Sequence, residues 1–268
     1  MRPVKIPASI LKYIDVNSSS PEALMKAAHS GYLTLLKNEP EVSIIIPAYN
    51  EELNIVPTLA SLCQNKTARS VEIIVVDNNS KDKTAHLANA CGVNCIRETQ
   101  QGITFARNKG LSIARGKYIL NADADSIYPE QWIESMVKPL EDEGIALTYG
   151  RFSLIPTGNT GRLTYFFYEY IAELSRFINK KVKDEAVNVY GFNSGFRRVE
   201  GLSVDSFNHP IHTNEDGWLA LKLRDKGYGK LHLVTSIDSL VWTTDRRIQL
   251  DGGLMKGFLK RFKRMLKP

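Results

Sequence analysis

The sequence of 268 residues has little cysteine and no long hydrophobic run. Its three cysteines, Cys63, Cys91 and Cys95, cannot form a complete set of disulfides, and their spacing matches no zinc motif. We therefore expect reduced cysteines and a cytoplasmic protein. No apolar stretch approaches the roughly 20 residues that a membrane-spanning helix needs. The first residues also lack the apolar segment of a secretory signal.

A basic surface is also missing from most of the chain, although the net charge is +6. From Arg246 onward there are eight basic residues and a single acid, Asp251, a net charge of +7. The preceding residues together therefore carry a net charge of −1. A charge confined to one end argues against a nucleic-acid-binding surface spread over the protein.

Alternating strand and helix patterns fill most of the sequence. Continuous β-branched runs at 42–47 and 71–76 are typical of strands that are buried on both faces. This order predicts an α/β fold with a mostly parallel central sheet flanked by helices. Further strands are expected at 93–96, 117–120, 145–150 and 230–234, and helices at 21–36, 56–63, 83–90, 104–114 and 129–140.

The helix expected at 21–36 belongs to an N-terminal helical extension, residues 1–41, laid on the outside of the main domain. Three serines, 18–20, offer caps for its first turn, and Pro21 suits that turn. A structural role is favoured for this segment.

Acidic side chains follow two of the predicted strands. Asp123 and Asp125 come directly after the strand at 117–120, and Asp77 follows the strand at 71–76. The carboxyl ends of parallel strands meet at one edge of a sheet, where ligands bind. Two carboxylates there suit a hard cation, Mg²⁺ or Mn²⁺. The alternatives are a solvated acidic turn at 123–125 and a helix cap for Asp77.

Four stretches, 45–51, 75–84, 106–108 and 122–125, resemble glycosyltransferase family 2 in order and spacing. That resemblance implies the GT-A fold and an inverting, nucleotide-sugar-dependent transfer. It implies that Asp77 and Arg107 hold the nucleobase. Asp123 and Asp125 would then serve the ribose, the metal ion and the diphosphate. Asn78 stands where the family often has an acid. The other donor-side candidates in these stretches are Pro47, Tyr49, Glu51, Asn79 and Ala122.

The second half of the chain supplies the expected acceptor side. An apolar, aromatic helical pattern over 163–178 is expected to be mostly core, with contact to a lipid-linked acceptor as the alternative. The glycine-rich stretch 190–198 is either a plain turn before a strand or, as in the family that it resembles, part of the acceptor site. The acceptor candidates there are Tyr190, Gly191 and Asn193.

Glu215 and Asp216 open a predicted helix. Acids in a first turn are stabilised by the helix dipole, so a structural role alone would explain them. The family carries a Glu-Asp pair at this point, and the resemblance implies that Asp216 is the general base and Glu215 its orienter or substitute. By the same resemblance, Arg246 or Arg247 would neutralise the diphosphate.

The basic tail, 246–268, carries an apolar stripe from Leu254 to Leu266. This composition is typical of a helix that binds anionic lipid, and the alternative is a terminal helix docked on the domain. The Gln-x-x-Arg-Trp motif of processive relatives is absent, which argues against a membrane-embedded polymer synthase.

These features together predict a glycosyltransferase domain at 42–245, with a nucleotide-sugar half at 42–126 and an acceptor half at 127–245. The predicted partners are a nucleotide sugar, with uridine favoured, and a glycan or lipid-linked acceptor. The expected setting is cell-surface glycan or glycolipid synthesis at the inner face of the membrane. The alternatives are a catalytically silent nucleotide-sugar-binding scaffold and a nucleotidyltransferase of related fold.

Overall fold

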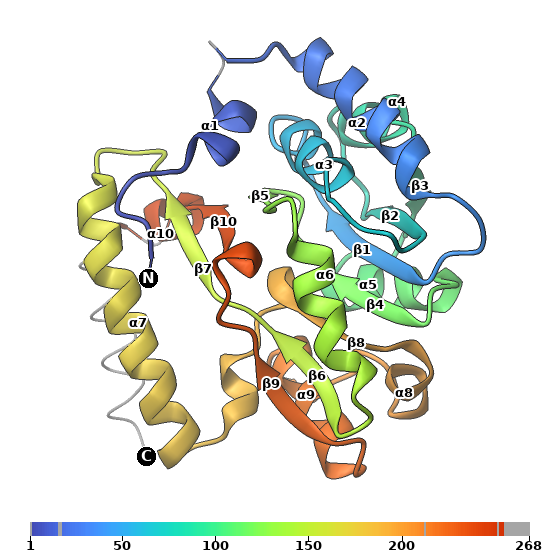
Figure 1. Ribbon diagram of the computed structural model, residues 1–268, viewed down its shortest axis with the longest axis vertical. Helices are drawn as coiled ribbons and strands as arrows, with labels where there is room; N and C mark the ends of the chain where they lie inside the picture. The colour runs from blue at the N-terminus through green and yellow to red at the C-terminus, as the bar shows by residue number, and fades with distance from the viewer. Residues whose placement is uncertain (1, 16–17, 212, 251, 255–268) are drawn as a thin grey trace.

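The computed structural model describes residues 2–15, 18–211, 213–250 and 252–254 (Figure 1). Its centre is a seven-stranded sheet in which β1 to β4 and the β6–β9 pair are parallel and β8 runs antiparallel to both neighbours. The predicted α/β class with a mostly parallel sheet is confirmed. The strand order is β3 (Asn94–Arg97), β2 (Val71–Asp77), β1 (Val42–Ala48), β4 (Tyr118–Asn121), β8 (Ser194–Arg197), β6 (Ile145–Tyr149) and β9 (Lys230–Leu233).

The large sheet has an apolar core on each face. Successive side chains of a strand point to opposite faces, and in the central strands both sets are apolar. Ile44 and Ile46 of β1 point into one core, and Ile45 points into the other; all three are fully buried. Such a strand has no solvent-facing side, which is why its sequence is a continuous apolar run.

Helices cover the two faces (Figure 1). Residues of α1, α2, α3 and α6 pack with Ile44 and Ile46, whereas residues of α5 and α9 pack with Ile45. The predicted cap of α2 is confirmed, because the N–H of Ala23 donates to the hydroxyl of Ser20 over 3.2 Å. The helices are α1 (Ala8–Ile14), α2 (Pro21–Leu35), α3 (Ile55–Cys63), α4 (Thr84–Ala90), α5 (Ile103–Ile113), α6 (Trp132–Val137), α8 (Arg198–Ser203) and α9 (Glu215–Asp225).

A second, smaller sheet was not predicted. It consists of β5 (Ser126–Ile127), β10 (Val241–Thr244) and β7 (Phe152–Ile155), with β10 in the middle. Because β5 directly follows Asp125, this sheet brings the end of β10 and the short helix α10 (Arg246–Leu250) beside the acidic pair.

The long helix α7 (Arg162–Val182) corrects one prediction. Its apolar residues were expected to be mostly core, but only Tyr165 and Glu169 of this helix are buried. Figure 1 shows α7 at the outer edge of the molecule, beside β7. Among the described residues, no helix combines the length and the hydropathy that crossing a bilayer requires. The helix predicted for the basic tail lies outside the described residues beyond Leu254.

Candidate active site

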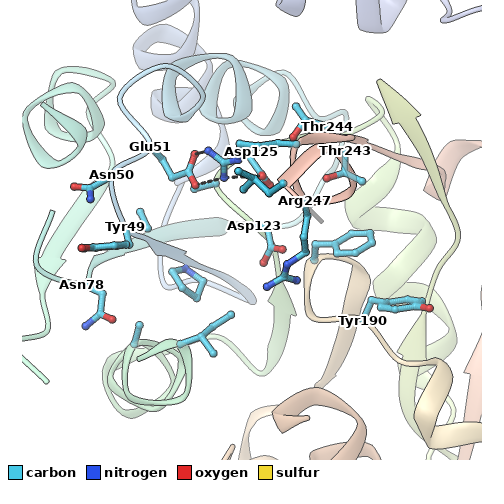
Figure 2. Close-up of a pocket in the computed structure, with 18 of the residues that line it drawn as sticks. Tyr49, Asn50, Glu51, Asn78, Asp123, Asp125, Tyr190, Thr243, Thr244 and Arg247 are labelled. Atoms are coloured by element: carbon cyan, nitrogen blue, oxygen red, sulfur yellow. Dashed lines mark hydrogen bonds and ion pairs between the residues drawn. The ribbon is translucent and has the colours of Figure 1, made fainter. Parts of the chain in front are cut away.

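A cavity of about 710 Å³ opens where the carboxyl ends of β1, β2 and β4 meet the second sheet (Figure 2). This is the edge at which parallel sheets bind ligands. Residues far apart in the sequence meet here: Tyr49 and Glu51 after β1, Asn78 after β2, Asp123 and Asp125 after β4, and Arg246 and Arg247 after β10.

The acidic pair lies in the cavity wall, as predicted from its place after β4. The backbone N–H of Asp123 donates to the hydroxyl of Tyr128 over 2.9 Å, which fixes the turn. Burial, together with the negative charges of Asp123 and Glu51, raises the pKa of Asp125 to about 6. Burial also raises the pKa of Asp123. The site therefore concentrates negative charge and favours a cation.

Arg246 bridges two of the acids at the cavity mouth. Its Nη1 donates to Oε2 of Glu51 over 3.0 Å, and its Nη2 lies 3.1 Å from Oδ2 of Asp125. The hydrogen bond to Glu51 is the main reason that the pKa of Arg246 is raised. Arg247 also lines the cavity, and Figure 2 shows its side chain reaching down beside Asp123. Two guanidinium groups therefore stand where they can contact an anionic ligand.

Arg107 lies beneath the cavity. This α5 side chain is 1% exposed, and its Nη2 donates to Oδ1 of Asp123 over 3.1 Å. Its Nε lies 3.5 Å from Oδ1 of Asp216, in the first turn of α9. Burial raises the pKa of Asp216 to about 7, with the charges of Glu215 and Asp123 acting in the same direction and that of Arg107 opposing it. Arg107 thus links the acidic pair to Asp216 and does not face the space where a base would bind.

Gly191 closes this buried group from above. A Cβ at this position would clash with the guanidinium of Arg107 and with both carboxylate oxygens of Asp216. Only a residue without a side chain allows the backbone to pass so close to the ion pair. The role of Gly191 in the structure is therefore to leave space for the side chains of Arg107 and Asp216.

Three polar residues at the end of β2, Asp77, Asn78 and Asn79, have different surroundings. Asp77 is buried and accepts the N–H of Ser80 over 3.3 Å, a contact within the turn and not the cap of α4, whose N-cap position is Lys83. The side chain of Asn78 lines the cavity and accepts the N–H of Gly102 over 2.7 Å. Asn79 adopts a left-handed φ of 66° and donates to the carbonyl of Thr99. Asn78 was expected only as a departure from the family pattern.

Of the remaining donor-side candidates, Pro47 and Tyr49 lie at the cavity surface and Ala122 lies in the protein interior. Pro47 and Tyr49 line the cavity. Ala122 is fully buried, and its N–H donates to the carbonyl of Ile45 over 3.0 Å, which extends the pairing of β4 with β1. Ala122 therefore holds the acidic pair in place and offers no side chain to a ligand.

An aromatic wall forms the other side of the cavity. Tyr190 and Phe192 stack at 5.7 Å between ring centroids, and Phe152 of β7 meets both rings edge to face. Asn193 is not part of this wall. Its amide accepts from the indole of Trp132 and donates to the carbonyls of Arg151 and Ser239, so its hydrogen-bonding groups are used within the core. The wall was not predicted because Phe152 and Phe192 carry no motif.

Glu215 and Asp216 begin α9, but neither caps the helix. The amide oxygen of Asn214 accepts the N–H of Gly217 over 2.6 Å and fills that role. This leaves the carboxylate of Asp216 for the ion pair with Arg107. Helix capping therefore does not explain why Glu215 and Asp216 stand at the start of α9.

Comparisons with known proteins show which family and which folds this chain resembles. The sequence profile described as glycosyl transferase family 2 matches residues 43–200. The chain is 30% identical over 198 residues to the glycosyltransferase AglE of Haloferax volcanii, which covers 70% of this chain and 63% of that protein. It is 33% identical over 116 residues to the dolichol-phosphate mannosyltransferase of Saccharomyces cerevisiae, covering 40% of this chain and 43% of that enzyme. The chain thus spans less than two thirds of the length of these relatives.

Two solved structures have similar folds. One is the mannosyltransferase PcManGT from Pyrobaculum calidifontis in complex with GDP-Man and Mn²⁺, with a TM-score of 0.58, 20% identity, and coverage of 96% of this chain and 75% of that chain. The other is glucosyl-3-phosphoglycerate synthase from Mycobacterium tuberculosis in complex with Mn²⁺, UDP-Glc and phosphoglyceric acid, with a TM-score of 0.53 and 21% identity. That alignment covers 79% of this chain and 73% of the synthase.

Proposed function

Because the chain belongs to glycosyl transferase family 2 and has the GT-A fold, we propose that it transfers a sugar from a nucleoside diphosphate sugar to an acceptor hydroxyl with inversion. The observation that carries this proposal is the meeting of Asp123, Asp125, Arg246 and Arg247 at one cavity. A diphosphate is an anion that arginine binds well and that carboxylates bind only through a cation. A cavity with both kinds of side chain suits such a ligand.

The nucleoside is proposed to lie against Pro47, Tyr49 and Asn78. These residues line the cavity next to the acidic pair, whereas Asp77 and Arg107 do not. We therefore move the base contact from Asp77 and Arg107 to the cavity wall that Asn78 helps to form. The amide of Asn78 itself donates to the carbonyls of Glu98 and Gln100 and accepts from Gly102, so it shapes this wall from within the protein. Uridine remains the favoured base. The solved neighbours bind GDP-Man in one case and UDP-Glc in the other, so both donors belong in the first assay.

The donor set fits a hard divalent cation, Mg²⁺ or Mn²⁺. Asp125 and Asp123 would hold the ion, since carboxylate oxygens are its preferred ligands. The pKa of Asp125 is raised first by burial and then by the negative charges of Asp123 and Glu51, and a bound cation would offset these charges. In the part of the chain that the structure describes, no three acidic, histidine or cysteine side chains form a complete metal site, so diphosphate oxygens would have to complete the coordination. When bound, the ion would offset charge on the leaving diphosphate.

Asp216 is the proposed general base, which would accept the proton of the acceptor hydroxyl during attack on the anomeric carbon. Its side chain is 5% exposed and lies under Gly191, outside the cavity lining, so the backbone at 191 has to move aside for the hydroxyl to reach it. A base is most effective when its pKa is near the working pH, and the pKa of Asp216 is raised to about 7. Arg107 holds the Asp216 carboxylate at a fixed distance from Asp123. Attack in line, from the face opposite the diphosphate, inverts the configuration. The negative charge of Glu215 contributes to the raised pKa of Asp216, and we propose Glu215 as its orienter or substitute.

The acceptor is proposed to lie along the aromatic wall of Phe152, Tyr190 and Phe192. Aromatic faces and Tyr hydroxyls suit a sugar ring or another partly apolar group. We propose an acceptor that is a glycan or a lipid-linked molecule and a role in cell-surface glycan or glycolipid synthesis at the inner face of the membrane. The curated relative named dolichol-phosphate mannosyltransferase supports a lipid-linked acceptor.

The proposal is tested by comparing the wild type with Asp216→Asn. Nucleotide affinity is measured by calorimetry, and transfer is measured with UDP-Glc and GDP-Man as donors and a panel of glycan and lipid-linked acceptors. We expect turnover to fall by about two to four orders of magnitude in the variant while nucleotide affinity is kept. Binding of nucleotide by the wild type without transfer to any acceptor would support a silent binding protein instead. Release of pyrophosphate from nucleoside triphosphates would support a nucleotidyltransferase.

A further inference from the structure

The helix α7 packs against the protein with its polar side. Glu169 is fully buried, where it accepts the N–H of Leu154 over 2.7 Å and a hydrogen bond from Arg162 over 3.0 Å. One turn further on, Glu173 accepts from Nε of Arg2 over 2.9 Å. The charged groups that usually face water are thus used in contacts with the rest of the fold.

The opposite side of α7 is apolar and exposed. Exposed apolar side chains recur there every three or four residues from Leu163 to Val182. They therefore form one continuous stripe, about 29 Å long at 1.5 Å per residue. The exposed fractions run from 40% for Tyr170 to 75% for Val182. The outer stripe consists of Leu163, Phe167, Tyr170, Ile171, Leu174, Phe177, Ile178 and Val182.

This orientation is the reverse of that of an ordinary surface helix, which turns its apolar face to the core. Soluble monomers rarely expose a contiguous apolar patch of more than a few hundred Å², and larger patches mark contacts with proteins or membranes. The ion pairs of Glu169 and Glu173 hold the helix in place, so the outer stripe is a fixed feature of the fold. An exposed apolar face of this kind is typical of a surface that contacts a partner.

The charges around the outer stripe indicate which partner. Lys181 and Lys183 are exposed at its C-terminal end, and Lys180 pairs with Glu185 over 2.8 Å. The acids of α7, Glu169 and Glu173, point inward, so no acidic side chain within Arg162–Val182 is exposed. An apolar stripe that ends in lysines matches the interface of an anionic bilayer, where acyl chains lie beneath negatively charged headgroups.

We propose that the outer stripe of α7 docks on an anionic membrane surface, with Leu174 and Phe177 in the interface and Lys181 and Lys183 on the headgroup phosphates. The C-terminal segment, 255–268, is a weaker candidate because it contains six basic residues and no acid, and these would be repelled by Lys181 and Lys183. A second copy would bring the same lysines without any exposed acid on α7 to meet them.

Docking through α7 also orients the cavity. Tyr168 of this helix and Leu250 of α10 line the cavity, so the bilayer would lie beside the aromatic wall. An acceptor hydroxyl on a membrane-anchored molecule then reaches the cavity without leaving the membrane. This consequence rests on the proposed function, whereas the docking itself does not.

The test is co-sedimentation of the full chain with vesicles, which requires no transferase activity. Vesicles of phosphatidylcholine alone are compared with vesicles that contain phosphatidylglycerol as well. The variant Leu174→Glu/Phe177→Glu is expected to lose at least fivefold in binding to the anionic vesicles. The matched control, Leu33→Glu/Val199→Glu, introduces the same charges at exposed apolar positions of α2 and α8 and should bind like the wild type. Thermal unfolding confirms that all variants are folded.

A second pair of measurements separates the possible partners. Lys181→Gln/Lys183→Gln should weaken binding to anionic vesicles at least fivefold and leave binding to neutral vesicles unchanged. An environment-sensitive dye on Leu174→Cys should shift to the blue on anionic vesicles, compared with the same dye on Leu33→Cys.

Three results would overturn the proposal. Wild-type binding by the α7 variant, with loss in Phe258→Glu/Phe262→Glu, would assign the membrane contact to the tail alone. A wild-type dimer that becomes a monomer in the α7 variant, without vesicle binding, would assign the outer stripe to a second copy. A dye at position 174 that is shielded in buffer and released by the tail variant would assign it to the segment 255–268.

Discussion

The buried guanidinium group of Arg107 carries the positive charge that two acids of the site share. It pairs with Asp123 at the cavity and with Asp216 below it, yet its Nε and Nη1 and Oδ1 of Asp216 have no hydrogen-bond partner. Buried polar atoms are nearly always satisfied in folded proteins, and exceptions are often functional. The group is therefore held by charge more than by ideal hydrogen bonds, and small movements would change the proton affinity of Asp216.

The raised pKa of Asp216 predicts how activity depends on pH. Below about 7 the carboxyl is protonated and cannot accept a proton, so turnover should rise as the pH increases through about 7. Initial rates at saturating substrates between pH 5.5 and 8.5 measure this. Glu143→Gln, which removes an exposed acid far from the cavity, should leave the profile unchanged. A rate that is independent of pH over this range would contradict the assignment.

Gly191→Ala tests the close packing over the ion pair. The added Cβ would clash with Arg107 and Asp216, and overpacking of this kind typically costs about 1–3 kcal/mol in the free energy of unfolding. We expect such a loss in urea unfolding, together with reduced turnover. Gly161→Ala is the matched control, because nothing lies within 4 Å of its Cβ position. Equal stability of the two variants would show that the backbone at 191 adjusts freely.

For single side chains, the sequence predicted which positions meet but not what each side chain does. Asp123, Asp125, Arg246 and Arg247 do line one cavity. Arg107 and Asn193 were predicted to contact ligands, and the structure places both in the interior with protein partners. Burial is a property of the whole fold, so a motif residue that points inward has the same local sequence as one that points outward.

Among the elements, the second sheet does most to complete the site. Asp245, at the end of β10, is fully buried and accepts the N–H of Thr157 over 2.9 Å and the hydroxyl of Tyr165 over 2.5 Å. These contacts fix the point at which α10 begins, and so they place Arg246 over Glu51 and Asp125. Arg246 and Arg247 are thereby anchored by a carboxylate that is itself fully buried.

Asn214→Ala tests the cap that positions Asp216. Loss of the hydrogen bond to the N–H of Gly217 should lower the free energy of unfolding by about 1 kcal/mol, as at other helix N-termini. Asn214→Ser keeps a capping oxygen and should retain most of the stability. Urea unfolding of the three proteins measures the difference. A loss of equal size in the serine variant would mean that the cap is not the source of the effect.

Element predictions succeeded where the periodic pattern was long. The strands β1 and β2 and the helices α2, α5 and α9 lie where the sequence placed them. The strands β7 and β10 have four residues each, too few to show a period, and they pair across about 90 positions of sequence. For α7 the pattern identified the apolar face correctly but not its direction, because periodicity does not reveal whether a face meets protein or surroundings.

For the whole molecule, topology explains how distant residues form one cavity. Three parallel strands end at the same edge, and β10 returns to that edge in the second sheet. The first half of this arrangement followed from the order of strands and helices, since parallel strands align their carboxyl ends. The second half depends on long-range pairing, which no local pattern contains.

We propose that Asp123 and Asp125 bind a nucleoside diphosphate through a divalent cation. Calorimetric titration of the wild type and of Asp125→Asn with UDP and GDP, with Mn²⁺ and with EDTA, tests this binding. We predict that the wild type binds one of the nucleotides at least tenfold more tightly with Mn²⁺ and that Asp125→Asn loses this difference. Equal affinity of the wild type with Mn²⁺ and with EDTA, or an unchanged Mn²⁺ effect in Asp125→Asn, would rule out a cation-dependent site at this acidic pair.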